Sequence, residues 1–307
     1  MNRRRFLAGA AALPFAPFLA DEAQKGQETR LVLLGTGGGP RPRKQSSGSS
    51  QVIVANGAAY VIDCGDGVAR QLVFADVPLP TLRHIFITHQ HSDHTADYGN
   101  LIWLAWTAGL KTEVDTWGPP PLERMTRLFF EMNASDIEGR MQSEGRVPIV
   151  PLVKVHEVSQ GGPLLEDGNV KVTAALVDHP PMVPALAYRF DAKDRSIVIS
   201  GDTRKSPRLL ELARNADVLV HSALYLPALD RLIARVGAAP RLKESILSLQ
   251  APVEDAARLA QEAGVKTLVL SHLIPADDPE VTESMWLEAA RPHFHGRIIV
   301  GKDLMAI

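Results

Sequence analysis

The feature that most constrains the fold of this chain is a cluster of histidines and an aspartate directly behind an apolar stretch. The stretch His84-Ile85-Phe86-Ile87-Thr88 is followed by His89, His91, Asp93 and His94. Such polar side chains are costly in an apolar core, but they are the ligand types that zinc and similar metals select. Because the apolar stretch predicts a strand, the cluster lies on a turn at its carboxyl end, where open α/β sheets hold their sites. The sequence therefore predicts a metal site at the edge of a sheet.

Short apolar runs alternate with helical segments along the chain, which predicts one α/β domain over residues 29–307. About 280 residues are enough for a single well-buried core. No fixed-period repeat is visible, which excludes a solenoid. We expect strands over residues 31–34, 51–54, 59–62, 85–88, 170–173, 196–200, 218–220 and 267–270. We expect helices over residues 99–109, 120–132, 207–215 and 252–264, and surface loops over 40–50 and 136–148.

The first residues of the chain have the pattern of an export signal. Three consecutive arginines from Arg3 precede an apolar stretch over residues 7–20, which contains Pro14 and Pro17. This stretch is short for a membrane span, which needs ~20 apolar residues. The pattern resembles a twin-arginine signal, which is an address and not an anchor. We therefore expect a signal peptide over residues 1–23, a periplasmic or secreted mature protein, and no membrane anchor in that mature form.

The cysteine content and the net charge limit the classes of protein to which this chain can belong. Cys64 is the single cysteine, so an intramolecular disulfide is excluded, and we expect a small, buried and inert side chain there. The formal net charge of −2 indicates no basic face, so we expect no stable nucleic-acid partner. One basic spot, formed by Arg41, Arg43 and Lys44, could steer an anionic substrate if its loop folds over the site.

Polar residues that can bind metals recur where later apolar runs end. His179, Asp202, His221 and His272 each follow or end such a run. If the strands form two packed sheets, these ends converge on one rim. A catalytic zinc takes about three protein ligands and an open position. Without His221, the residues available are too many for one tetrahedral ion, but they suit two ions bridged by the Asp202 carboxylate.

The spacing of these residues resembles the metallo-β-lactamase superfamily. The motif His89-x-His91-x-Asp93-His94 and the downstream His179, Asp202 and His272 carry the resemblance. Further motifs, over residues 34–40, 63–67, 201–203 and 271–273, are similar to the ribonuclease Z and arylsulfatase-like branch. The resemblance implies an αββα four-layer sandwich with two zinc ions at its edge, which manganese or iron could replace. It implies that His89, His91 and His179 bind the first ion, that Asp93, His94 and His272 bind the second, and that Asp202 bridges them.

Two positions depart from the ribonuclease Z pattern. Relatives carry a glutamate where this chain has Ser222, and a histidine where it has Gln250. In that family the pair is understood to help protonate the departing group, which neither serine nor glutamine does near neutral pH. This favours an ester with a good leaving group, such as a phenolate or a sulfate. The long arm with which such nucleases hold tRNA is not evident in the sequence. A carboxylate at position 202, where some true β-lactamases place a cysteine, points away from antibiotic hydrolysis.

These observations predict an exported two-metal hydrolase of small phosphodiesters or sulfate esters, with a metal-bridging hydroxide as nucleophile. Asp93 would orient the nucleophile or accept its proton. His221 is the nearby titrating residue left to protonate the leaving group, and a structural role is equally open to it. The alternatives are a 3′-tRNA endonuclease, a lactonase or β-lactamase, and a non-catalytic metal-dependent binding module. The expected partner is a small anionic ester, and a homodimer is left open.

Two further motifs are expected to be structural. The run Gly35–Gly39 follows a strand, but Pro40 ends it and no helix is predicted next, so it favours a tight turn beside the site over a dinucleotide loop. Several aromatic residues lie near the metal motif at helical spacing, which favours the core over a substrate pocket. These are Trp103, Trp106, Trp117, Phe129 and Phe130.

Overall fold

The computed structural model describes residues 29–237 and 239–307. The expected signal peptide, residues 1–23, lies outside the described residues. Within the described part of the chain, no helix is both long and apolar enough to cross a membrane.

The first half of the chain, together with the last strand, forms a sheet of seven strands in the order β14-β1-β2-β3-β4-β5-β6. The hairpin between β2 and β3 turns at Asn56 and Gly57, both of which have positive φ, as a tight two-residue turn requires. From β3 to β6 the strands run parallel. The strands are β1 Arg30–Gly35, β2 Ser50–Ala55, β3 Ala58–Ile62, β4 Leu82–Phe86, β5 Val114–Gly118, β6 Val153–Glu157 and β14 Met305–Ala306.

The second half of the chain forms another sheet of seven strands in the order β13-β12-β11-β10-β9-β8-β7. Strands β10 to β13 are parallel, and β9 is antiparallel to both β10 and β8. β8, β10 and β12 therefore run in the same direction and end at one edge. The strands are β7 Gly162–Glu166, β8 Val170–Val177, β9 Ala185–Ala192, β10 Ser196–Ile199, β11 Val218–Leu224, β12 Thr267–Ile274 and β13 Arg297–Val300.

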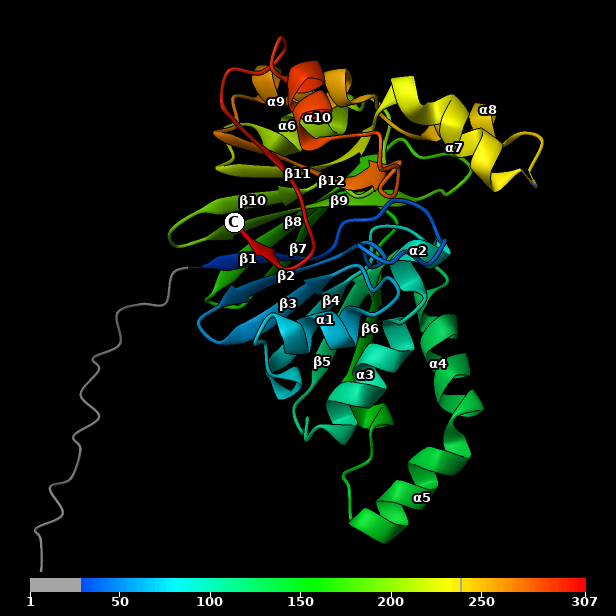
Figure 1. The fold of residues 1–307 in the computed structure, drawn as a ribbon. Coiled ribbons are helices and arrows are strands. Elements are labelled where there is room, and N and C mark those ends of the chain that lie inside the picture. Colours follow the sequence, from blue (N-terminus) through cyan, green and yellow to red (C-terminus); the bar gives the residue numbers. More distant parts are fainter. Residues whose placement is uncertain (1–28, 238) are drawn as a thin grey trace, which may run out of the picture.

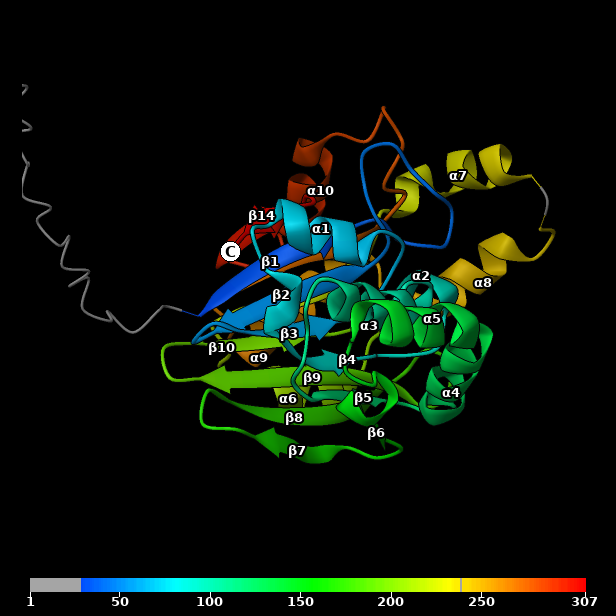
Figure 2. The same ribbon diagram turned by 90° about the horizontal axis from the view of Figure 1, so that it is seen from below.

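Helices cover the outer face of each sheet, as Figures 1 and 2 show. The first sheet packs against α1 and α3, and the second against α6, α9 and α10. Between the sheets lies a third apolar cluster, in which the Phe86 ring contacts Tyr188 and Phe190 with ring centres 5.3 and 5.2 Å away. The helices are α1 Val68–Phe74, α2 Ser92–Thr95, α3 Tyr98–Thr107, α4 Leu122–Met132, α5 Ala134–Glu144, α6 Pro207–Ala213, α7 Leu229–Val236, α8 Leu242–Leu249, α9 Val253–Ala263 and α10 Glu283–Ala290.

This arrangement confirms the αββα sandwich and the eight predicted strands. The four predicted helices correspond to α3, α4, α6 and α9. The prediction of a loop over residues 136–148 is wrong, because most of that segment is helix α5. Arg140 stabilises this helix through Asp136 and Glu144, each four residues away, and its guanidinium lies over the ring of Trp103.

The aromatic residues near the metal motif belong to the core. Trp106 and Phe130 are buried, and Trp103 and Phe129 pack against the same cluster on the outer face of the first sheet. Trp117 packs between the sheets, with its ring 6.3 Å from that of Phe86. The structural interpretation of these residues is confirmed.

Helices α7 and α8 form a hairpin at the edge of the second sheet. In Figures 1 and 2 this hairpin (yellow) projects beyond the sandwich at the edge where α2 lies. Leu229 and Leu232 of α7 form a small separate core with Leu224 and Ile274, at the ends of β11 and β12. Outside this core, the Arg231 side chain donates a hydrogen bond of 3.0 Å to Asp278. The hairpin is therefore anchored beside the carboxyl ends of the strands.

Candidate metal centre

The seven residues predicted as metal ligands come from both sheets and meet at one edge. His89 and His91 lie in the segment after β4, and Asp93 and His94 lie in α2 directly behind it. His179 follows β8, Asp202 follows β10, and His272 lies near the end of β12. The parallel direction of β8, β10 and β12 brings the last three residues to the same rim.

Three histidine nitrogens form the first group. Nε2 of His89 and Nε2 of His179 each lie 3.0 Å from Nδ1 of His91. Around a tetrahedral zinc ion with bonds of ~2.0–2.1 Å, neighbouring ligand atoms lie about 3.3 Å apart. The three nitrogens are therefore close to the spacing that one ion requires.

A second group lies beside the first. Nε2 of His272 is 3.1 Å from Oδ2 of Asp93 and 3.1 Å from Oδ2 of Asp202. Nε2 of His94 is 3.7 Å from Oδ2 of Asp93 and 3.5 Å from Oδ1 of Asp202. Nε2 of His179, in the first group, is 3.9 Å from Oδ2 of Asp202. The Asp202 carboxylate therefore borders both groups.

The donor atoms of these groups fit a divalent metal. Nε2 of His94 and Oδ1 of Asp202 are buried and have no hydrogen-bond partner among the described residues. Burying such polar atoms without a partner is costly, and a bound cation removes this cost. The donors are imidazole and carboxylate, the set that zinc, manganese and iron accept.

Asp63 is a functional candidate to which the sequence analysis gave no role. Its Oδ2 atom accepts a hydrogen bond of 2.7 Å from Nδ1 of His94, and both of its oxygens accept hydrogen bonds from Thr88. This contact places the proton of His94 on Nδ1 and leaves Nε2 free for a metal. Asp63 directly follows β3, so the rule that identified the other ligands, a polar residue at a strand end, applies to it too.

The glycine run packs directly against the candidate ligands. The amide of Gly39 donates a hydrogen bond of 2.8 Å to Oδ2 of Asp93. A Cβ atom on Gly38 would lie 2.6 Å from the side chain of Ile274 and 2.8 Å from Nδ1 of His272. No side chain fits there, so the glycine run lies beside the site as predicted. It does so as an extended segment, in which Gly37 forms bridges to Gly48 and Leu273.

His272 reaches the site through an irregularity in its strand. Ser271 pairs with Ser222 and Leu273 pairs with Ala223, so His272 is an extra residue in β12. Its φ is +45°, an uncommon value for a residue with a side chain. Bulges of this kind are frequent next to active sites, where they redirect a side chain.

Burial and neighbouring charges set the protonation states of the candidate ligands. Burial lowers the pKa of His89, His91 and His179, which keeps these rings neutral. Burial alone would raise the pKa of Asp202, but His272 and His94 hold it well below its ordinary value. Burial alone would lower the pKa of His94, but Asp63, Asp202 and Asp93 raise it well above 6.5. These carboxylates therefore favour a positive charge at His94, which a bound cation would supply in place of the proton on Nε2.

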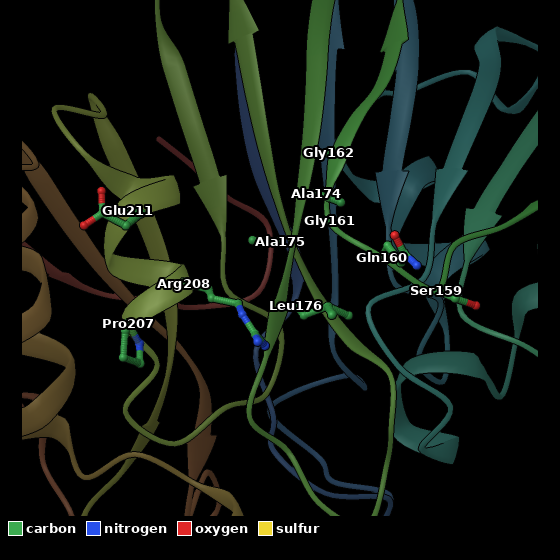
Figure 3. A pocket seen from close by; sticks show the side chains of 10 residues that line it. All are labelled: Ser159, Gln160, Gly161, Gly162, Ala174, Ala175, Leu176, Pro207, Arg208 and Glu211. Atoms are coloured by element: carbon green, nitrogen blue, oxygen red, sulfur yellow. The ribbon is translucent and has the colours of Figure 1, made fainter.

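Five of the seven candidate ligands line a cavity of about 290 Å³. The lining includes these five residues, His91, Asp93, His179, Asp202 and His272, together with apolar residues of α7 and α8. A wider hollow of about 790 Å³ lies elsewhere, between α6 and the segment that precedes β7 (Figure 3). That hollow is lined by Arg208 and Glu211 but by none of the candidate ligands. The metal chemistry therefore belongs to the smaller cavity.

His221 belongs to none of the groups of candidate ligands. Its side chain is buried, and its Nδ1 donates a hydrogen bond of 2.6 Å to the carbonyl of Ser222. Burial lowers its pKa. Its role as an acid stays a prediction, and the geometry favours the structural alternative.

The two altered positions lie close to the site. Nε2 of Gln250 donates a hydrogen bond of 2.6 Å to Oδ2 of Asp202, and Gln250 lines the cavity. The hydroxyl of Ser222 is buried without a partner among the described residues. Neither side chain can supply a proton at neutral pH.

The three cations of the basic loop have different positions. Arg43 is largely buried and donates hydrogen bonds to the carbonyls of Gly38 and Gly39, so it holds the glycine run and is not a free steering group. Arg41 lines the metal cavity. Lys44 is exposed and lines a different hollow. Only Arg41 is placed to meet a ligand of the metal site.

Comparison with known proteins agrees with this geometry. The profile of a family described as "Beta-lactamase superfamily domain" matches residues 59–273. Ribonuclease Z from Mycobacterium bovis (strain BCG / Pasteur 1173P2) is 31% identical over 277 residues, which cover 89% of this chain and 96% of the relative.

Solved structures share the fold. The metallo-β-lactamase fold protein YhfI from Bacillus subtilis aligns with a TM-score of 0.67 and 20% identity, covering 91% of this chain and 98% of the other. The short form of human tRNase Z aligns with a TM-score of 0.66, the same identity and the same coverage.

Proposed function

Because this chain belongs to the metallo-β-lactamase superfamily of metal-dependent hydrolases, we propose that it is a two-metal phosphodiesterase, with RNA as the first substrate to test. One observation of the structure carries the proposal: the Asp202 carboxylate borders both ligand groups and lines a single cavity. The choice of a phosphodiester, and of RNA, follows from the ribonuclease Z relatives, which the chain matches over nearly their whole length.

The proposed ligand assignment follows the two groups. His89, His91 and His179 would hold one divalent ion. Asp93, His94 and His272 would hold the other, with Asp202 between them. Two such ions, which we propose to be zinc, lower the pKa of water toward neutrality and offset charge on a phosphoryl group.

The protein's own groups would orient the reaction. Oδ2 of Asp93 is held by the amide of Gly39 and by Nε2 of His272, whereas Oδ1 of Asp93 has no hydrogen bond to the described residues. Asp93 also lines the cavity, so it is the carboxylate placed to accept a proton from water there. Gln250 would hold Asp202 in place through its amide.

A small ester is a second candidate substrate, favoured by a specific observation. The cavity is about 290 Å³, at the lower end of the range for small-molecule sites. Ser222 and Gln250 also stand where the ribonuclease Z resemblance implies a pair that assists the leaving group. A phosphodiester or sulfate ester with a good leaving group would need no such assistance.

Location is part of the proposal. The expected signal peptide supports export to the periplasm or beyond. Cell fractionation tests this export. Cells that express the full chain are compared with cells that express a control in which Arg3 and Arg4 are both changed to lysine. Accumulation of the control in the cytoplasm supports export, whereas an unchanged distribution contradicts it.

The substrate is tested with a panel of compounds. Zinc-loaded protein is incubated with a tRNA precursor that has a 3′ trailer, bis-p-nitrophenyl phosphate, p-nitrophenyl sulfate, a lactone and a chromogenic β-lactam. Cleavage of the precursor supports the first proposal, and cleavage of the small phosphodiester or sulfate alone supports the second. Turnover confined to the lactone or β-lactam contradicts both, and no turnover with metal bound indicates a binding module.

A pair of variants ties any activity to the site. Asp202→Asn removes the shared carboxylate, and we expect activity to fall at least 100-fold. The exposed His295→Ala is the matched control, and its activity should equal that of the parent protein. Unchanged activity of Asp202→Asn would contradict the proposed centre.

A further inference from the structure

Helix α8 presents an apolar face that is only partly covered by protein. Leu242, Ile246 and Leu249 are spaced four and three residues apart, so they lie on one face of the helix. All three line the metal cavity. No residue of α8 is fully buried, although these three side chains are apolar. The face is therefore directed at the cavity and is not part of a closed core.

This face is held at a fixed place relative to the candidate ligands. The carbonyl of Leu249 accepts a hydrogen bond of 3.0 Å from Nδ1 of His179, and the next residue, Gln250, donates to Asp202. Ile246 packs against the small core that α7 forms with Leu224 and Ile274. The end of α8 is thus bonded to the ligand groups, which makes its apolar face a wall of the site.

The rest of the cavity has the opposite character. Arg41 is the one lysine or arginine among the lining residues, and its guanidinium makes no hydrogen bond or ion pair within residues 29–237 and 239–307. The lining also contains members of both ligand groups, His91 and His179 of the first and Asp93 and His272 of the second. A ligand that fits both parts has an anionic ester and, attached to it, an uncharged apolar group.

We propose that Leu242, Ile246 and Leu249 bind one uncharged ring attached to the scissile ester, and that this wall sets the substrate specificity of the site. The inference rests on the proposed ester hydrolysis. A cavity of about 290 Å³ accommodates the ester and one ring but not a long chain. The ring could be an aryl group or a nucleobase, since both present a flat, weakly polar face.

The test measures binding, not turnover. Calorimetry gives the Kd values of phenylphosphonate and methylphosphonate with the zinc-loaded protein. Both carry the same anionic head, so their ratio reports the ring alone. We expect phenylphosphonate to bind about tenfold more tightly, and Ile246→Asn to reduce that ratio to below threefold while it leaves methylphosphonate binding within twofold. A ratio near one in the parent protein, or an unchanged ratio in the variant, would overturn the proposal.

A matched control lies on the same helix. Leu247 is 47% exposed and does not line the cavity, so Leu247→Asn should leave the ratio unchanged. An equal loss in both variants would show a general effect on α8 and would also overturn the proposal. Thermal melting and zinc content verify each variant, and Leu242→Asn replaces Ile246→Asn if the latter fails to fold.

A second pair of ligands distinguishes the source of the ring. Uridine 5′-monophosphate is compared with ribose 5-phosphate by the same measurement. A tenfold preference for the nucleotide that Ile246→Asn abolishes indicates a nucleobase, whereas a ring effect seen only with phenylphosphonate indicates an aryl group. Because no ligand is turned over, a failed phosphodiesterase assay with an intact ring effect would refute the proposed function alone.

Discussion

Oδ2 of Asp63 lies 2.7 Å from Nδ1 of His94, and both side chains are almost completely buried. The contact joins the end of β3 to α2 and so links a residue outside the ligand groups to one inside them. Carboxylates in this position orient a histidine ligand and make it more basic. The finding extends the candidate centre beyond the residues that touch a metal.

Replacing Asp63 tests this role. We expect Asp63→Asn to weaken zinc binding by about 10- to 100-fold, because His94 loses the carboxylate that fixes its ring. Competition with a chromogenic chelator measures the affinity. Asp66→Asn, an exposed carboxylate in the same loop, is the control and should bind zinc like the parent protein. Equal affinities of the two variants would show that Asp63 does not orient a ligand.

Introducing the glutamate and histidine that the ribonuclease Z resemblance implies tests the effect of Ser222 and Gln250 on the reaction. The double variant Ser222→Glu, Gln250→His should raise kcat for a diribonucleotide, whose leaving group is an alkoxide, by about tenfold or more. It should change kcat for bis-p-nitrophenyl phosphate less than threefold, because that leaving group needs no proton. Gln250→His alone, with zinc content measured, controls for disturbance of Asp202. A parallel change for both substrates would contradict an effect on the leaving group.

The basic loop offers a contrast between two arginines. Arg41→Ala should raise KM for an anionic ester several-fold and leave the melting temperature unchanged, because Arg41 lines the cavity and its guanidinium has no partner among the described residues. Arg43→Ala should lower the melting temperature, because the carbonyls of Gly38 and Gly39 lose their donor. Steady-state kinetics and calorimetric melting of both variants measure this. A lower melting temperature of Arg41→Ala together with a raised KM of Arg43→Ala would contradict these two roles.

The contacts of Asp217 predict that the free energy of unfolding depends on pH in a way that does not involve the metal. Hydrogen bonds from Lys266 and Ser196 lower its pKa from 3.8 to about 2. Its stabilisation is therefore complete above pH 3.8 and is lost as the pH falls through 2. Asp217→Asn should reduce the free energy of unfolding at pH 7 by about 1 kcal/mol, since the pair is partly exposed.

Melting of the metal-free protein measures this difference. The parent protein should melt at a higher temperature than Asp217→Asn at pH 7, and this difference in melting temperature should disappear near pH 2. Asp230→Asn is the control, because Asp230 also pairs with a lysine, Lys243, but is 79% exposed. A difference in melting temperature that stays constant over this range of pH would contradict the stabilising role of the ionised Asp217.

Much of the site could be predicted because one physical pattern repeats. His179, Asp202 and His272 stand where apolar runs end, and parallel strands bring such ends to one edge. Asp63 follows the same pattern, but a lone carboxylate after a strand is common and nothing local connects it to His94. The order of the strands and their register determine that contact.

Other features depend on tertiary contacts that no local pattern reports. The α7–α8 hairpin was not predicted, because α7 is stabilised by packing of Leu232 with Ile274, more than forty residues later. The turn that directs His272 into the site arises from one extra residue relative to β11, which is visible only when the two strands are paired. Helix α5 contains Gly139, which lowers its helix propensity, and the ion pairs of Arg140 with Asp136 and Glu144 form only once the segment is helical.

The division of the candidate ligands between the two sheets has a consequence for assembly. Residues 89–94 belong to the first sheet, and the remaining ligands belong to the second, with Asp93 and His272 separated by 179 positions in the chain. A metal held by both would act as a crosslink across a very long loop, and its binding energy would count toward joining the sheets. Neither half of the chain holds a complete group of ligands. Tight metal binding would therefore require that the two halves have already packed together.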